Sequence, residues 1–123
     1  MARVLVTGGA GYIGSHACKR LAAAGHVPVC FDAFATGWRD AVRFGPLIEG
    51  SLLDPDAVAR AFAEAKPDAV MHFAARSLVG ESVRNPALYW RENVLGALNL
   101  LEGMRAAGVD ALVFSSTAAT FGE

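Results

Sequence analysis

The sequence is poor in cysteine, and this limits the metal and redox chemistry that it can support. Only two cysteines occur in 123 residues, Cys18 and Cys30. Neither has metal-ligand spacing with the other or with His16, His26 or His72, so we expect no metal site. Two isolated thiols in apolar segments suit a reducing compartment, which favours the cytoplasm.

The sequence also lacks a dominant charge and a long hydrophobic run. The net charge is −1 at pH 7 with both signs interspersed, which gives no electrostatic footprint for a nucleic acid or an acidic membrane surface. No apolar run approaches membrane-spanning length, and the chain opens on a strand instead of a charged segment with a cleavage site. We therefore expect a cytoplasmic protein with neither nucleic acid nor membrane as a partner.

Apolar residues make up 54% of the chain and charged residues 19%, enough to bury the core of one domain. Strand-like apolar runs alternate with helical patterns, and the runs are apolar throughout, which indicates a parallel sheet covered on both faces. The expected strands are 4–6, 27–31, 47–48, 69–73 and 111–114. This order predicts an α/β fold, a Rossmann-type doubly wound parallel sheet that is truncated after the fifth strand.

Three helices connect these strands in the expected fold. The first follows the first strand and carries Ile13, Ala17, Leu21 and Ala24 on one face. The second opens at Pro55 and closes before Pro67. The third is a long helix over 87–107, with Asn85 and Pro86 at its start and Gly108 after its end.

A glycine-rich turn stands between the first strand and the first helix. Gly9, Gly11 and Gly14 satisfy G-x-G-x-x-G, and Gly8 opens the wider G-x-x-G-x-x-G pattern. Glycine is needed where a strand turns sharply into a helix and the backbone approaches a pyrophosphate, which sits at the helix N-terminus. Asp32 follows the second strand about 20 residues on, where an acid meets the adenosine ribose. The segment predicts a dinucleotide site.

Two other nucleotide sites fit less well. A P-loop needs Lys and Ser or Thr where Ser15 and His16 stand. Asp32 would repel a 2′-phosphate, so NAD is favoured over NADP, although Arg39 and Arg43 leave NADP as a minor alternative. The loops after the first, fourth and fifth strands should surround one crevice at the carboxyl edge of the sheet.

Five stretches together resemble the extended short-chain dehydrogenase/reductases, and among them the NAD-dependent epimerase/dehydratase family. They are 7–16 (TGGAGYIGSH), 72–75 (HFAA), 79–83 (VGESV), 93–96 (NVLG) and 115–122 (SSTAATFG). They cover the chain from end to end in the family's order. The combination is far more specific than the glycine pattern alone.

The resemblance implies NAD contacts along the carboxyl edge. The pyrophosphate would lie at Tyr12 and Ile13, the ribose at Asp32, and the adenine beside Ser51 and Leu52. The full set of implied cofactor positions is Gly8, Gly11, Tyr12, Ile13, Gly14, Asp32, Ser51, Leu52, Phe73, Ala74, Ala75, Ser77 and Asn93. Phe73 to Ser77 would line the nicotinamide half.

Some positions remain ambiguous or depart from the family. For Asn93 a helix-packing amide is an equally good interpretation. The family usually has an acid at Ser51 and an asparagine at Ala33, so two adenosine contacts are weakened or replaced. His72 is better explained as a packed, hydrogen-bonded residue than as a catalytic base.

The resemblance also implies a reaction on a UDP-hexose. Thr117 matches the Ser or Thr that assists at the sugar C4 hydroxyl. The related dehydratases carry an Asp-Glu pair where Ala118 and Ala119 stand, so dehydration is disfavoured. The expected reaction is reversible oxidation at C4 through a 4-keto intermediate, which makes the family's enzyme a 4-epimerase.

The family's catalytic Tyr-x-x-x-Lys does not occur in these 123 residues. Tyr12 belongs to the pyrophosphate turn, and Tyr89 has Asn93 four residues on. We therefore expect an incomplete NAD-binding domain over 1–123 that does not turn over by itself, with the sugar-nucleotide part also missing. The alternative is a non-catalytic NAD-binding or sensing module.

The helix over 87–107 carries Val94, Leu98 and Leu101 on one face, with Leu95 and Met104 widening the apolar surface. In the family the equivalent helix joins a helical dimer interface. The resemblance therefore implies a homodimer for the complete protein.

Overall fold

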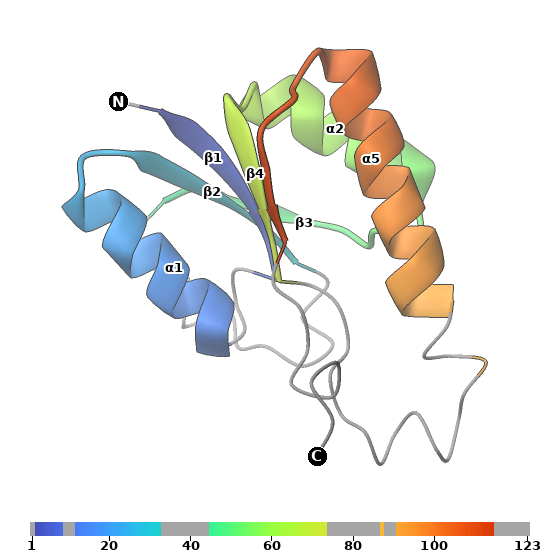
Figure 1. Ribbon diagram of the computed structural model, residues 1–123, viewed down its shortest axis with the longest axis horizontal. Helices are drawn as coiled ribbons and strands as arrows, with labels where there is room; N and C mark the ends of the chain where they lie inside the picture. Colours follow the sequence, from blue (N-terminus) through green and yellow to red (C-terminus); the bar gives the residue numbers. More distant parts are fainter. Residues whose placement is uncertain (1, 9–11, 33–44, 74–86, 88–90, 115–123) are drawn as a thin grey trace.

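The computed structural model describes residues 2–8, 12–32, 45–73, 87 and 91–114 of the chain. Its strands form one parallel sheet in the order β3-β2-β1-β4-β5 (Figure 1). The elements in chain order are β1 (Arg3–Thr7), α1 (Tyr12–Ala23), β2 (Val27–Asp32), β3 (Leu47–Glu49), α2 (Pro55–Ala65), β4 (Ala69–His72), the π-helical turn η2 (Arg91–Leu95), α5 (Gly96–Ala107) and β5 (Leu112–Phe114). The predicted five-stranded, doubly wound parallel sheet is confirmed.

Strand β1 lies at the centre of the sheet, where both of its faces are covered. Its side chains alternate, so Leu5 packs in one core cluster while Val4 and Val6 pack in another. Helices α2 and α5 cover the first of these faces, and α1 covers the second (Figure 1). This placement explains why the strand is apolar throughout instead of alternating with polar residues.

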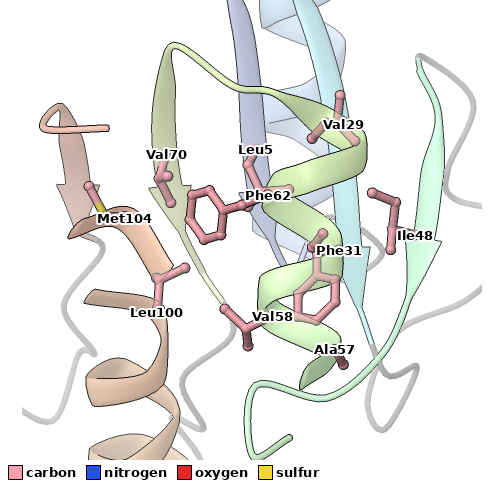
Figure 2. Packing of buried hydrophobic residues seen from close by; sticks show 12 residues of the cluster. Leu5, Val29, Phe31, Ile48, Ala57, Val58, Phe62, Val70, Leu100 and Met104 are labelled. Carbon is pink, nitrogen blue, oxygen red and sulfur yellow. The ribbon is translucent and has the colours of Figure 1, made fainter. Parts of the chain in front are cut away.

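The larger cluster fills the space between the sheet and the helices α2 and α5. Figure 2 shows Phe62 and Val58 of α2 between side chains of the sheet and of α5. The buried members are Leu5, Val29, Phe31, Ile48, Ala57, Val58, Ala61, Phe62, Ala65, Val70, Leu100 and Met104. A Cβ at Gly103 would lie 2.7 Å from Cε2 of Phe62, so the glycine lets α5 approach this ring.

The smaller cluster joins α1 to the opposite face of the sheet. Cys18 is buried there with Val4 and Val6, and Leu21 packs against them. Burial raises the pKa of the Cys18 thiol to about 11, so this cysteine stays protonated and unreactive at neutral pH. The predicted apolar face was wrong at its last position, because α1 ends at Ala23 and Ala24 is exposed.

Helix α2 has a clear start signal and a clear stop signal. The Asp54 side chain caps the N-terminus by accepting a hydrogen bond from the N–H of Asp56 at 3.0 Å, and Pro55 occupies the first turn. At the other end Lys66 adopts a left-handed conformation with φ 46°. That conformation is strained for a residue with a Cβ, and glycine is the usual choice there.

We expect Lys66→Gly to stabilise the protein by about 0.5–1 kcal/mol, because relief of the left-handed strain exceeds the added freedom of the unfolded chain. Chemical denaturation of the two proteins measures the difference. Lys66→Ala is the control, since alanine keeps the strain and should bring no gain. Equal gains from glycine and alanine would contradict this explanation.

The long helix predicted over 87–107 is not one uninterrupted α-helix. Residues 91–95 form a π-helical turn, and the α-helix α5 runs from Gly96 to Ala107 before Gly108 ends it with φ 74°. The extra residue in a π turn changes which side chains face the sheet. Of the predicted apolar surface, Met104 is buried together with Gly96 and Leu100, whereas Val94, Leu95, Leu98 and Leu101 are exposed.

Candidate functional site

The candidate site lies at the carboxyl edge of the sheet. From β1 the chain passes through α1 to β2 on one side of β1, and β4 and then β5 lie on the other side, so the strand order reverses between β1 and β4. Ligands of open α/β sheets bind in the crevice outside such a switch point. Figure 1 shows the carboxyl ends of the strands and the start of α1 on the same side of the molecule.

Gly8, directly after β1, is the described residue of the glycine-rich turn. Gly8 has φ 74°, a conformation that disfavours any residue with a Cβ. Its N–H donates a hydrogen bond to the carbonyl of Phe31 at 2.9 Å, which fixes the turn against the end of β2. Helix α1 begins with Tyr12 and Ile13, and Gly14 is buried in its first turn. These positions agree with the predicted strand, turn and helix.

Asp32 ends β2 at the same edge, as predicted. It is half-buried, and its carbonyl accepts a hydrogen bond from the N–H of Gly50 at 3.2 Å. A Cβ at Gly50 would lie 2.9 Å from Cε1 of Phe31, so only glycine lets this segment pass so close to β2. The loop after β3 is thereby placed beside the acid.

That loop contains the two residues expected beside adenine. The Ser51 side chain accepts a hydrogen bond from the N–H of Leu53 at 3.1 Å, which folds the loop into a tight turn. The carbonyl of Leu52 accepts a hydrogen bond from Nδ2 of Asn99, at 2.7 Å, across 47 residues of sequence. Sequence reasoning missed Asn99, because no local pattern shows which loop a helix will contact.

A buried polar pair joins β1 and β4 at the switch point. Thr7 and His72 are paired across the two strands, and the Thr7 hydroxyl lies 2.6 Å from Nδ1 of His72. The N–H of Phe73 donates to both oxygens of Thr7, to the carbonyl at 2.9 Å and to the hydroxyl at 3.2 Å. The His72 ring also packs against Phe114 of β5, with centroids 5.2 Å apart. The pair therefore holds the N–H of Phe73 at the end of β4.

His72 is the packed histidine that the sequence favoured. It is 2% exposed, and burial lowers its pKa from 6.5 to about 4. The imidazole is thus neutral throughout the physiological range. Its partner Thr7 was not anticipated, since the contact follows from the strand register and not from any local motif.

We expect the folded protein to lose stability as the pH falls from about 6.5 to about 4, because in that window the unfolded chain protonates His72 and the folded one does not. The loss attributable to His72 is about 2 kcal/mol between pH 6.5 and pH 5. Denaturation curves at both pH values measure it. His72→Gln keeps a polar partner for Thr7 without titrating, so the pH dependence should shrink by this amount. An unchanged pH dependence in the variant would contradict the assignment.

Comparison with known proteins identifies the family. The sequence profile of the NAD dependent epimerase/dehydratase family matches residues 4–123. The chain belongs to this family. The family match agrees with the strand order, with the left-handed Gly8 turn and with an acid at the end of β2.

Several UDP-glucose 4-epimerases are similar to this chain. That of Rhizobium leguminosarum bv. trifolii is 52% identical over 119 residues, which cover 97% of this chain and 36% of that protein. The crystal structure of the Brucella ovis enzyme in complex with NAD gives a TM-score of 0.93 at 47% identity, covering 98% of this chain and 37% of that one. The Thermus thermophilus enzyme in complex with NAD gives a TM-score of 0.91 at 48% identity, covering 94% and 37%. The chain thus spans about a third of the length of these relatives.

Several positions expected to contact the cofactor lie outside the described residues. These positions are Gly11, Ala74, Ala75 and Ser77. The expected catalytic residue Thr117 also lies outside the described residues. Asn93 is half-buried in the π turn η2. Within the described part of the chain, no three His, Cys, Asp or Glu side chains form a group that could hold a metal ion. In the same part, no helix is long and apolar enough to span a membrane.

Proposed function

We propose that this chain is the NAD-binding portion of a UDP-glucose 4-epimerase, which interconverts UDP-glucose and UDP-galactose by reversible oxidation at C4. The observation that carries the proposal is the 52% identity to such an enzyme over 97% of the chain. The carboxyl-edge geometry supports it, since turn, acid and loop occur together there. Family membership alone would also allow other epimerases and dehydratases.

The residues at the carboxyl edge fit NAD. The left-handed Gly8 and the start of α1 would hold the pyrophosphate, together with Gly11, Tyr12, Ile13 and Gly14. Asp32 would accept hydrogen bonds from the ribose hydroxyls and repel a 2′-phosphate. Ser51 and Leu52 would lie beside the adenine. Phe73, Ala74, Ala75, Ser77 and Asn93 would lie toward the nicotinamide half.

The chain's own residues have distinct tasks in the reaction. Bound NAD supplies the ability to take a hydride from the sugar C4 and to return it. The Thr117 hydroxyl would hydrogen-bond the C4 oxygen and help to move its proton. His72 takes no part in proton transfer, because burial encloses it and a pKa of about 4 makes it a weak proton acceptor. Its contribution is to hold Thr7 and the N–H of Phe73 in place.

The substrate and assembly belong to the same proposal. The Thermotoga maritima UDP-glucose 4-epimerase was crystallised with UDP-glucose, and we propose a UDP-hexose as substrate here. The exposed apolar stripe Val94, Leu95, Leu98 and Leu101 supports a homodimer, because such side chains favour burial. Cys18 and Cys30 are buried and are not joined by a disulfide, which suits the reducing cytoplasm.

The test is an epimerase assay on the protein expressed from the complete coding sequence. We expect UDP-galactose to be converted to UDP-glucose, with Thr117→Val reducing kcat by about a hundredfold or more as a hydroxyl that assists proton transfer is removed. The 123-residue chain alone should show no turnover. NAD binding without epimerisation by the complete protein would overturn the proposal in favour of a non-catalytic module.

A further inference from the structure

The loop between β3 and α2 is held at three points, and only its centre depends on a distant element. At its start the N–H of Gly50 donates to the Asp32 carbonyl. At its end the N–H of Asp54 donates to the Ser51 carbonyl at 3.1 Å, and Asp54 caps α2. Both of these anchors come from the loop itself or from a strand and helix next to it. The middle residue, Leu52, is held by α5.

Two contacts from adjacent turns of α5 converge on Leu52. The Asn99 amide donates to its carbonyl at 2.7 Å in a half-buried position. One turn earlier, a Cβ at Gly96 would lie 3.3 Å from the Cβ of Leu52, so the absence of a side chain lets the helix reach the loop. The 2.7 Å distance between Asn99 Nδ2 and the Leu52 carbonyl oxygen is short for an N–H···O hydrogen bond, and the site is partly shielded from water.

We propose that Asn99 is a positioning residue for the adenosine end of the NAD site, acting through the backbone of Leu52. This inference rests on the proposed function, which puts Ser51 and Leu52 beside the adenine. The hydrogen bond fixes the peptide plane that follows Leu52, and with it the side chain of Leu52 and the turn at Ser51. A loop ordered before the cofactor arrives costs no ordering free energy on binding, so the gain appears as affinity.

Asn99 would help this chain to keep an adenosine contact where Ser51 replaces the family's usual acid. The Ser51 hydroxyl accepts a hydrogen bond from the N–H of Leu53 and so stabilises the turn. It does not offer the cofactor the negative charge that the family's acid would. Without a charged contact, the affinity of this turn for the adenosine depends more on its backbone conformation. Asn99 holds that conformation from outside the loop.

The test compares Asn99→Leu with the unmodified protein expressed from the complete coding sequence. Leucine has the same number of side-chain heavy atoms and the same branching at Cγ as asparagine, and it favours the helix, so loss of the amide donor is the main change. We expect NAD and ADP-ribose to bind about fivefold more weakly, as for one lost hydrogen bond. The kcat at saturating NAD should stay unchanged, since nothing near the sugar moves. Amide hydrogens of Leu53 and Asp54 should exchange faster.

Met104→Val is the matched control. Met104 lies on the buried face of α5, about two turns beyond Gly96, so its replacement lowers stability without removing the Asn99 hydrogen bond to Leu52. Equal NAD affinity in the Leu variant and the unmodified protein, or an equal loss in the Met104 variant, would overturn the role of Asn99 and leave the proposed function intact. Failure of the unmodified protein to bind NAD would overturn both.

Discussion

Replacing Asp32 by alanine is expected to weaken NAD binding by about tenfold to a hundredfold, the effect of losing hydrogen bonds to a charged group. The residue ends β2 beside the loop that Gly50 brings close, where the ribose hydroxyls are expected. Isothermal titration of the protein expressed from the complete coding sequence measures the change. Affinity for NADP should fall less or rise, because repulsion of the 2′-phosphate is removed.

The control for this experiment is Asp110→Ala. Asp110 is an exposed acid that precedes β5, at the opposite edge of the sheet from the candidate site. Its replacement changes the net charge by the same amount and should leave both affinities unchanged. Equal losses from the two alanine variants would show that Asp32 acts through overall charge and not through a contact with the ribose.

Phe62→Ala is expected to produce the largest loss of stability, about 3–5 kcal/mol, because it leaves a cavity in a core that cannot close around it. Phe62 is buried at the centre of the cluster between α2, α5 and the sheet (Figure 2). Gly103 allows α5 to contact this ring. Removal of the ring therefore removes a contact between α2 and α5 as well as leaving a cavity in the core. Urea denaturation followed by circular dichroism measures the loss.

Glu64→Ala serves as the comparison on the same helix. Glu64 is exposed and forms a surface ion pair with Arg60, at 3.5 Å, so its removal should change stability by no more than about 0.5 kcal/mol. A Phe62→Ala loss of the same small size would mean that the ring is not part of a close-packed core. Both variants keep the helix-forming tendency of α2.

Features encoded by neighbouring residues were predictable from the sequence. The start of α2 at Pro55 and the apolar spacing of Val58 and Phe62 were read from adjacent positions, and the structure confirms both. Asp32 was predicted in the same way, from its distance to the glycine turn. In each case the signal lies within one element or one β-α-β unit.

Features that depend on tertiary pairing were not predictable. The face of α5 that is buried could not be chosen, because both faces are apolar. The Thr7–His72 pair depends on parallel register between strands 65 residues apart. The Asn99 contact with Leu52 likewise depends on how α5 crosses a loop 47 residues earlier.

The position of β1 at the centre of the sheet has a consequence for synthesis on the ribosome. Its partner β2 follows after a short connection, but Thr7 meets His72 only after 65 further residues have been added. At the usual elongation rate this takes about 3–13 s, far longer than local folding steps. One edge of a strongly apolar strand therefore stays open on the nascent chain, available to a chaperone or to another chain, until β4 is made. The strand that is synthesised first is enclosed late.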